Sequence, residues 1–74
     1  MAKKQATEAV YRVTEVIGTS PTSWEDAASR AVAAASQTLR DLRIAEISKL
    51  DMKVENGKVV AYRARILLSF KYDA

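Results

Sequence analysis

The feature that most constrains the fold is a long hairpin pattern over residues 44–72. The second half of this stretch alternates at period two, and one face collects Val60, Tyr62, Ala64, Ile66, Leu68, Phe70 and Tyr72. Such alternation is typical of a strand with one buried face. The first half, from Ile44 to Glu55, is β-leaning but mixed. Asn56-Gly57 between the halves predicts the turn, because both residues tolerate a positive φ.

The length of this hairpin predicts assembly. Each arm of roughly a dozen residues spans about 40 Å, which is long for a chain of 74 residues. A core this small rarely supplies more than ~3–5 kcal/mol, and small folds usually add disulfides, a metal or oligomerisation. Cys and His are absent, which excludes disulfides and zinc sites of the usual kind. We therefore expect other copies of the chain to cover part of the hairpin.

Composition also narrows the function. Without Cys or His the chain lacks the commonest nucleophile and the commonest general base, so we expect no enzyme activity. Twelve basic and nine acidic residues give a net charge of +3, but the two signs are interleaved, and a nucleic-acid binder is a weaker alternative. No apolar run is long enough for a membrane span, and the first residues lack the apolar core of a signal peptide. We expect a soluble, cytoplasmic protein with no membrane partner.

The first half of the chain predicts one strand and one helix. Residues 10–17 are rich in β-branched side chains and place Tyr11, Val13 and Ile17 on one face with Glu15 among them, and we expect this strand to end at Gly18. Residues 1–8 are expected to form a frayed polar tail. Helical spacing continues from Trp24 to about Leu42, through Ala28, Ala31, Val32, Ala35 and Leu39.

The start of the helix carries its own signals. Ser23 is the expected N-cap with Asp26 at the N3 position, and Thr22 with Glu25 is the alternative. Glu25 and Asp26 in the first turn suit the positive end of the helix dipole, and from the residues alone we prefer this interpretation to a cation site. Trp24 is expected to pack at the edge of the core rather than to serve as a ligand platform.

The predicted fold class is therefore α+β. The element order is β-α-β-β, with a three-stranded antiparallel sheet packed on one helix, and residues 1–74 form a single domain. On the last strand Arg63 and Arg65 lie on the face opposite Tyr62 and Ile66. They could bind phosphate or carboxylate groups, but salt bridges to acids of the neighbouring strand or of another copy are equally consistent.

In their order and spacing, four stretches of the chain resemble the dodecins. These are Val13-Thr14-Glu15-Val16-Ile17-Gly18-Thr19-Ser20, Gln37-Thr38-Leu39-Arg40, Glu46-Ile47 and Tyr62 to Phe70. The resemblance covers about Tyr11 to Phe70, and the Gly-Thr-Ser turn is its most specific part. The resemblance implies a hollow homododecamer of β-α-β-β chains. It also implies a role in storing or buffering flavins, because many dodecins bind them.

Two positions depart from the flavin-binding pattern. The resemblance places flavin rings between Trp side chains at the position of Ile44, and it places a Gln that holds the ring edge at the position of Arg63. Ile44 offers no aromatic face, and Arg63 has no acceptor. The residues that would line a ligand site here are Ile44, Glu46, Arg63 and Arg65.

The stretch Gly18 to Glu25, with the later Asp51-Met52, resembles a branch of the family that lacks the flavin Trp and binds calcium. Only oxygen ligands are available, which suits Ca²⁺, and copies meeting at a symmetry axis could complete a site. The candidate metal ligands are Glu25, Asp26 and Asp51. We expect a cage that binds or stores a small ligand or ion, with calcium favoured over FMN or riboflavin. The alternatives are an oligomer without a ligand and a flavin-binding dodecin despite the missing Trp.

Overall fold

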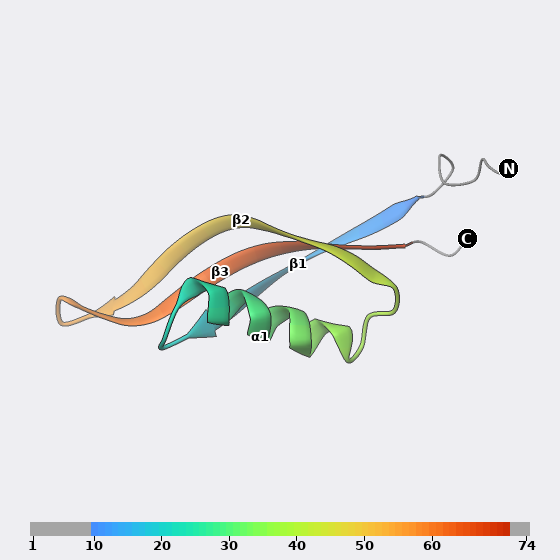
Figure 1. The fold of residues 1–74 in the computed structure, drawn as a ribbon. Helices are drawn as coiled ribbons and strands as arrows, with labels where there is room; N and C mark the ends of the chain where they lie inside the picture. Colours follow the sequence, from blue (N-terminus) through green and yellow to red (C-terminus); the bar gives the residue numbers. More distant parts are fainter. Residues whose placement is uncertain (1–9, 72–74) are drawn as a thin grey trace, which may run out of the picture.

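The computed structural model describes residues 10–71, which form one sheet and one helix (Figure 1). The elements in chain order are β1 (Tyr11–Ser20), α1 (Trp24–Ser36), β2 (Leu42–Glu55) and β3 (Lys58–Lys71). The sheet is antiparallel with β3 in the centre, in the order β1-β3-β2. The α+β class and the β-α-β-β order are therefore confirmed. The expected tail at residues 1–8 and the face position of Tyr72 lie outside the described residues.

The hairpin turn forms where the sequence predicts it. Asn56 has a φ of 52° and Gly57 a φ of 75°, the two positive values that a two-residue hairpin of the twisted type requires. β2 and β3 pair from Glu55 and Lys58 at the turn as far as Leu42 and Phe70, with register shifts that bend the pair. In Figure 1 this hairpin extends well beyond the end of α1.

The prediction that the first strand ends at Gly18 is wrong, because β1 continues to Ser20. Gly18 pairs with Ala64 of β3 and lies directly beneath the helix. A Cβ at this position would approach the carbonyl oxygen of Ala27 to 2.1 Å. The glycine therefore serves to bring α1 close to the sheet and does not break the strand.

The prediction that the helix continues to about Leu42 is also wrong, because α1 ends at Ser36. The amides of Thr38 and Leu39 both bond to the carbonyl of Ala35, at 3.0 and 2.8 Å, and close the last turn. Asp41 then adopts a positive φ of 57° before β2. Leu39 and Leu42 lie beyond the helix but still pack against the core. Their spacing in the sequence therefore extended the helical apolar pattern past the true end of α1.

The core lies between α1 and the centre of the sheet. Its fully buried side chains from β3 are Ala64, Ile66 and Leu68, and α1 contributes Ala27 and Ala31. The small helix residues allow close packing, and the long residues of β3 fill the space, as the period-two pattern predicted. We call this the helix side of the sheet and the opposite face the outer face.

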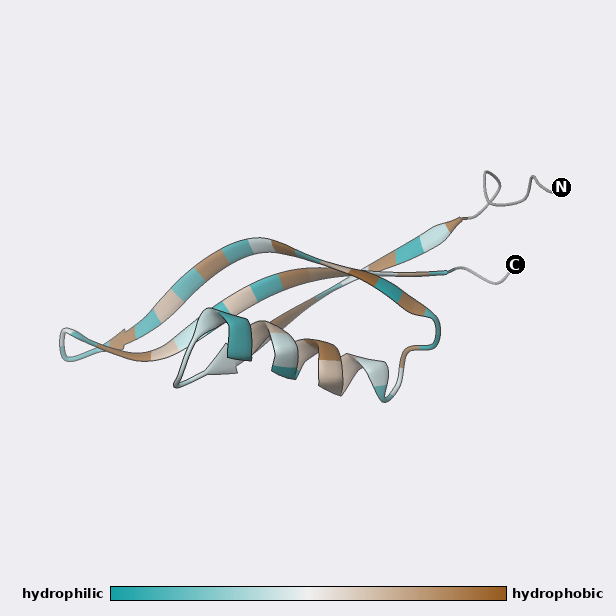
Figure 2. Cartoon of the chain, viewed as in Figure 1, coloured by the Kyte–Doolittle hydropathy of each residue, from teal (hydrophilic) through white to brown (hydrophobic). Residues whose placement is uncertain are grey.

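The helix leaves the β2 edge of the helix side uncovered. Leu50, which pairs with the buried Ala64, is 50% exposed. Ile47, Met52 and Val60 are similarly exposed. Figure 2 shows apolar segments alternating with polar ones along the part of the β2–β3 hairpin that extends beyond α1. No helix within residues 10–71 is long and apolar enough to cross a membrane.

Candidate functional site

The outer face of the sheet carries most of the side chains that the sequence singled out. Residues paired across strands share a face, and those that alternate with the buried Ala64 and Ile66 point outward. Their register gives four successive rows, Thr19–Arg63–Asp51, Ile17–Arg65–Lys49, Glu15–Leu67–Glu46 and Val13–Ser69–Ile44. The predicted ligand-site residues Ile44, Glu46, Arg63 and Arg65 therefore lie on one face, spread over all four rows.

The first row contains the best-formed ion pair of this face. The Nε and Nη2 groups of Arg63 donate to the two carboxylate oxygens of Asp51, at 2.7 and 2.9 Å. These hydrogen bonds lower the pKa of Asp51 below its usual value, and the same bonds raise the pKa of Arg63. Of the interpretations proposed for Arg63 from the sequence, the structure contains the salt bridge to an acid of the neighbouring strand.

The second row is held more loosely. The Nη1 group of Arg65 lies 3.4 Å from Oε1 of Glu15 on β1, in a single contact. Lys49 stands opposite Arg65 on β2, and Ser48, the extra residue at a register shift, donates its hydroxyl to the carbonyl of Arg65 at 3.1 Å. Two cations thus face each other across β2 and β3, which is an unfavourable arrangement for directly opposed side chains.

Trp24 connects the start of the helix to the first row, which contains Asp51 and Arg63. Its indole Nε1 donates to the backbone carbonyl of Asp51 at 3.0 Å. The ring makes an edge contact with Tyr62, with centroids 5.1 Å apart. The expectation that Trp24 packs at the edge of the core is confirmed. Asp51 is consequently held at both its side chain and its backbone.

Ser23 is the N-cap, as predicted, and its hydroxyl accepts from the amide of Asp26 at 3.0 Å. The Asp26 carboxylate does not complete a capping box. It accepts a hydrogen bond of 2.6 Å from the hydroxyl of Ser20, a residue that is only 1% exposed. The same carboxylate forms an ion pair with Arg30 at 2.7 Å. The hydrogen bond from Ser20, more than the charge of Arg30, lowers the pKa of Asp26.

Ser20 is the residue of this region that sequence reasoning missed. Its hydroxyl oxygen also accepts from the amides of Thr22 and Ser23, at 2.9 and 3.4 Å. The signals in the sequence were its place in the Gly-Thr-Ser stretch and its position before Pro21 in a run of cap-forming residues. The pairing of Glu15 with Arg65 was also missed, because the two residues are fifty positions apart.

The candidate metal ligands do not converge within one chain. No group of three carboxylates that could hold a metal ion occurs among residues 10–71. Asp26 and Asp51 each have an arginine partner, and Glu25 is exposed on the first turn of α1. The donors suit calcium in kind, because all are oxygen. The described residues of one chain therefore bring no two of these three candidates onto a common cation position.

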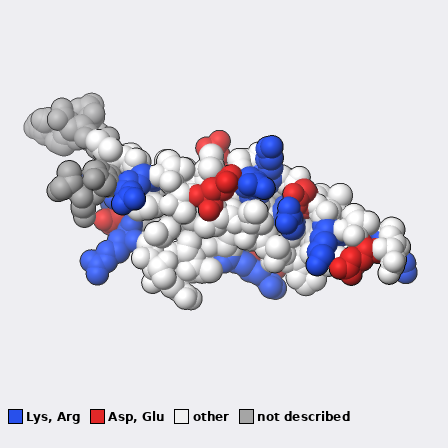
Figure 3. Space-filling model, turned by 180° about the vertical axis from the view of Figure 1, so that it is seen from behind, with Lys and Arg blue, Asp and Glu red and all other residues white. Residues whose placement is uncertain are grey.

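The charges of the outer face do not form a patch of one sign. Figure 3 shows this face with basic and acidic side chains interspersed along its length. Within the described residues, this face therefore shows no continuous basic stripe of the kind typical of nucleic-acid binders. The Arg63–Asp51 and Arg65–Glu15 pairs contribute to this interspersed pattern.

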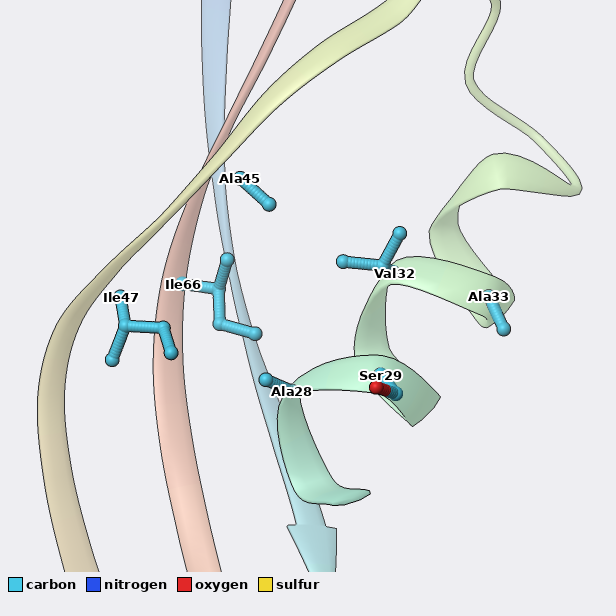
Figure 4. Close-up of a pocket in the computed structure, with 7 residues that line it drawn as sticks. All are labelled: Ala28, Ser29, Val32, Ala33, Ala45, Ile47 and Ile66. Carbon is cyan, nitrogen blue, oxygen red and sulfur yellow. The ribbon is translucent and has the colours of Figure 1, made fainter. Parts of the chain in front are cut away.

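A second feature is an open apolar groove between α1 and β2, of about 360 Å³ (Figure 4). It is lined by Ala28, Ser29, Val32, Ala33, Ala45, Ile47 and Ile66. The groove adjoins the uncovered β2 edge, so the two together form one exposed apolar region on the helix side.

The element order and the sheet topology define a small α+β protein of the β-α-β-β type. Its central strand carries arginines paired with acids of both edge strands. The dodecin family model matches residues 10–73, and the chain belongs to the dodecin family. It is 45% identical over 62 residues to a calcium dodecin of Mycobacterium tuberculosis, covering 84% of this chain and 87% of that one.

Solved structures agree with this assignment. The dodecin of Streptomyces coelicolor superposes with a TM-score of 0.85 at 38% identity, covering 92% of this chain and 97% of the other. The crystal structure of calcium dodecin from M. tuberculosis, described as calcium chelating with a calcium-binding site, gives a TM-score of 0.76. Its identity is 46%, over 86% of this chain and 91% of that chain. The resemblance noted from the sequence is thereby confirmed.

Proposed function

We propose that this chain forms a hollow homododecamer that binds and stores calcium in the cytoplasm, with the whole of residues 1–74 as one domain and no catalytic activity. The observation that carries the proposal is the 45% identity to a calcium dodecin over most of both chains. The all-oxygen donor set supports it, because calcium accepts carboxylates and carbonyls from several chains. Glu25, Asp26 and Asp51 are the proposed ligands.

Assembly is supported by the uncovered β2 edge. Leu50, Met52 and Ile47 are each about half exposed, although their cross-strand partners Ala64, Tyr62 and Ile66 lie toward the helix. Covering such a stripe with a second copy removes apolar area from water, worth roughly 25 cal/mol per Å².

The outer face argues against tight flavin binding. Ile44 is 57% exposed and presents no aromatic ring, and both Nε and Nη2 of Arg63 are occupied by Asp51. A flavin would find neither a stacking partner at the first position nor a hydrogen-bond acceptor at the second, where the guanidinium is also turned to Asp51. We therefore propose calcium in preference to FMN or riboflavin.

The test is the metal content, absorbance spectrum and mass of the protein as purified. We expect a mass near twelve chains by light scattering, calcium binding by calorimetry and no flavin absorbance. A monomer of 8.2 kDa that unfolds cooperatively would contradict the cage. A cage in which millimolar Ca²⁺ produces neither heat nor a change in thermal stability would contradict the ligand.

A further inference from the structure

The end of the β2–β3 hairpin, residues 50–60, extends beyond α1 (Figure 1), and we call it the arm. Alternation along β2 places Leu50, Met52 and Val54 on the helix side and Lys53 on the outer face. Val54 is 57% exposed, and Leu50 and Met52 are each about half exposed. Within the described residues, the arm is therefore a two-stranded segment whose apolar face is left uncovered.

The groove beside α1 is the second exposed apolar surface of the helix side. α1 packs chiefly on β1 and β3, so the helix forms one wall and β2 stays open as part of the floor. Figure 4 shows Ala28 and Val32 of the helix on one side of this space and Ile47 and Ile66 of the sheet on the other. The groove has room for an apolar element laid alongside the helix.

We propose that the arm of one copy packs in the groove of a second copy, with its apolar face against α1 and β2 and its charged face in solvent. The proposal rests on the assembly in the proposed function and specifies the contact that builds it. The arm and the groove are different surfaces of the chain, so the contact runs head to tail and each copy gives one arm and receives one. Such contacts close into a ring when the rotation between copies allows it.

The size of the two surfaces supports this pairing. The exposed parts of Leu50, Met52, Val54 and its cross-strand partner Val59 amount to roughly 400 Å², as large as the patches that mark interaction sites. Each copy would bury about twice this area, once in its arm and once in its groove, close to the ~800 Å² per partner of a stable interface. Two arms packed on each other would bury less and leave both grooves open to water.

The experiment is cross-linking of the assembled protein through introduced cysteines with a short thiol-specific bismaleimide. The chain has no cysteine of its own, so each introduced thiol is unique. Ser29→Cys marks the groove, which Ser29 lines, and Val54→Cys marks the apolar face of the arm. Lys53→Cys is the matched control, one residue away on the outer face of the same arm. Chains of two variants are unfolded together, reassembled and treated, and the covalent dimers are identified by mass spectrometry.

We expect Ser29→Cys with Val54→Cys to give mainly dimers that contain one chain of each kind, and Ser29→Cys with Lys53→Cys to give few. Dimers of two Val54→Cys chains in at least equal yield would overturn the inference, because one arm would then meet another arm. Equal yields of mixed dimers for Lys53→Cys and Val54→Cys would also overturn it, because the apolar face would not direct the contact. If Val54→Cys does not assemble, Val59→Cys on the paired strand takes its place with the same expectation.

The outcomes separate this contact from the proposed calcium storage. A full-sized assembly that gives no mixed dimer would overturn the contact and leave the cage of the proposed function standing. A mixed dimer from an assembly that gives no heat with millimolar Ca²⁺ would support the contact and contradict the proposed ligand. A monomer of 8.2 kDa would contradict both.

Discussion

The two faces of the sheet differ in what holds their side chains. On the helix side, Ala64, Ile66 and Leu68 are fully buried against the small residues of α1. On the outer face, Val13 and Ile44 are 58% and 57% exposed, and the central arginines are fixed by carboxylates of both edge strands. The comparison teaches that apolar packing holds the side chains of one face, while ion pairs between strands hold the central side chains of the other.

The division is sharpest along β3, whose successive residues alternate between the two roles. Ala64 and Ile66 belong to the core, and Arg63 and Arg65 belong to the paired charges. A shift of one residue in the pairing would exchange the faces, so the hydrophobic pattern fixes the register strongly. The paired charges of the outer face are consequently positioned by the same packing that forms the core.

The largest expected effect is at the closest contact of the helix side. Gly18→Val would place a branched side chain against the carbonyl of Ala27, which a single Cβ already approaches to 2.1 Å. We expect a loss of about 3 kcal/mol or more in the free energy of unfolding, measured by urea denaturation, because the helix must move off the sheet. The control Gly57→Ala meets no atom within 4 Å and should cost only about 1 kcal/mol, for its positive φ. Equal losses would show that close packing at Gly18 is unimportant.

Leu50→Glu tests whether the uncovered edge of the helix side is an interface. A carboxylate in place of a half-exposed leucine should weaken each contact by about 2–3 kcal/mol, because it removes apolar area and places a charge where water is excluded. The expected result by light scattering is a smaller species. Lys58→Ala at the hairpin end is the matched change outside this stripe. A full-sized assembly for Leu50→Glu would mean that another surface joins the copies.

Ile44→Trp tests the outer face. The substitution adds a ring at the position where the resemblance places the flavin-stacking Trp. Stacking of a base on an aromatic side chain is worth ~1–3 kcal/mol, so riboflavin affinity should rise roughly 5- to 150-fold, read out as quenching of its fluorescence. Stoichiometric quenching by the unmodified protein at submicromolar concentration would show that Ile44 does not decide flavin binding.

The smallest expected effect is the pH dependence of stability. The pKa values of Asp26 and Asp51 are lowered in the folded chain, chiefly by the hydrogen bonds from Ser20 and Arg63. A depressed folded pKa gives stability that is present above the unfolded value near 3.8 and is lost as the pH falls through the folded value. The urea concentration at which half of the protein is unfolded should therefore decrease as the pH is lowered below about 4.

Asp51→Asn separates the contribution of the outer face from that of the helix start. It should reduce the fall in the urea midpoint on acidification, while the part due to Asp26 remains. Because both carboxylates are exposed, the difference should be modest. An unchanged acid dependence in the variant would mean that the Arg63 pair adds no stability.

The sequence by itself determined the element order, the hairpin turn at Asn56-Gly57, the helix start at Ser23 and the buried face of β3. Each of these depends on local rules, namely period-two alternation, tolerance of positive φ and side-chain capping. It also determined the family, through stretches that keep their order along the chain. These features need no knowledge of contacts distant in sequence.

Only the tertiary structure decided where the helix ends, what Gly18 does and which acid pairs with which arginine. Leu39 continues the apolar spacing although it lies beyond α1, because a connecting segment can pack on the same core as a helix. From the sequence, Gly18 was predicted to end the strand. In the structure α1 packs on Gly18 so closely that no Cβ fits there. The Asp51–Arg63 pair lies within one row and the Glu15–Arg65 pair joins two adjacent rows, so both depend on strand order and register.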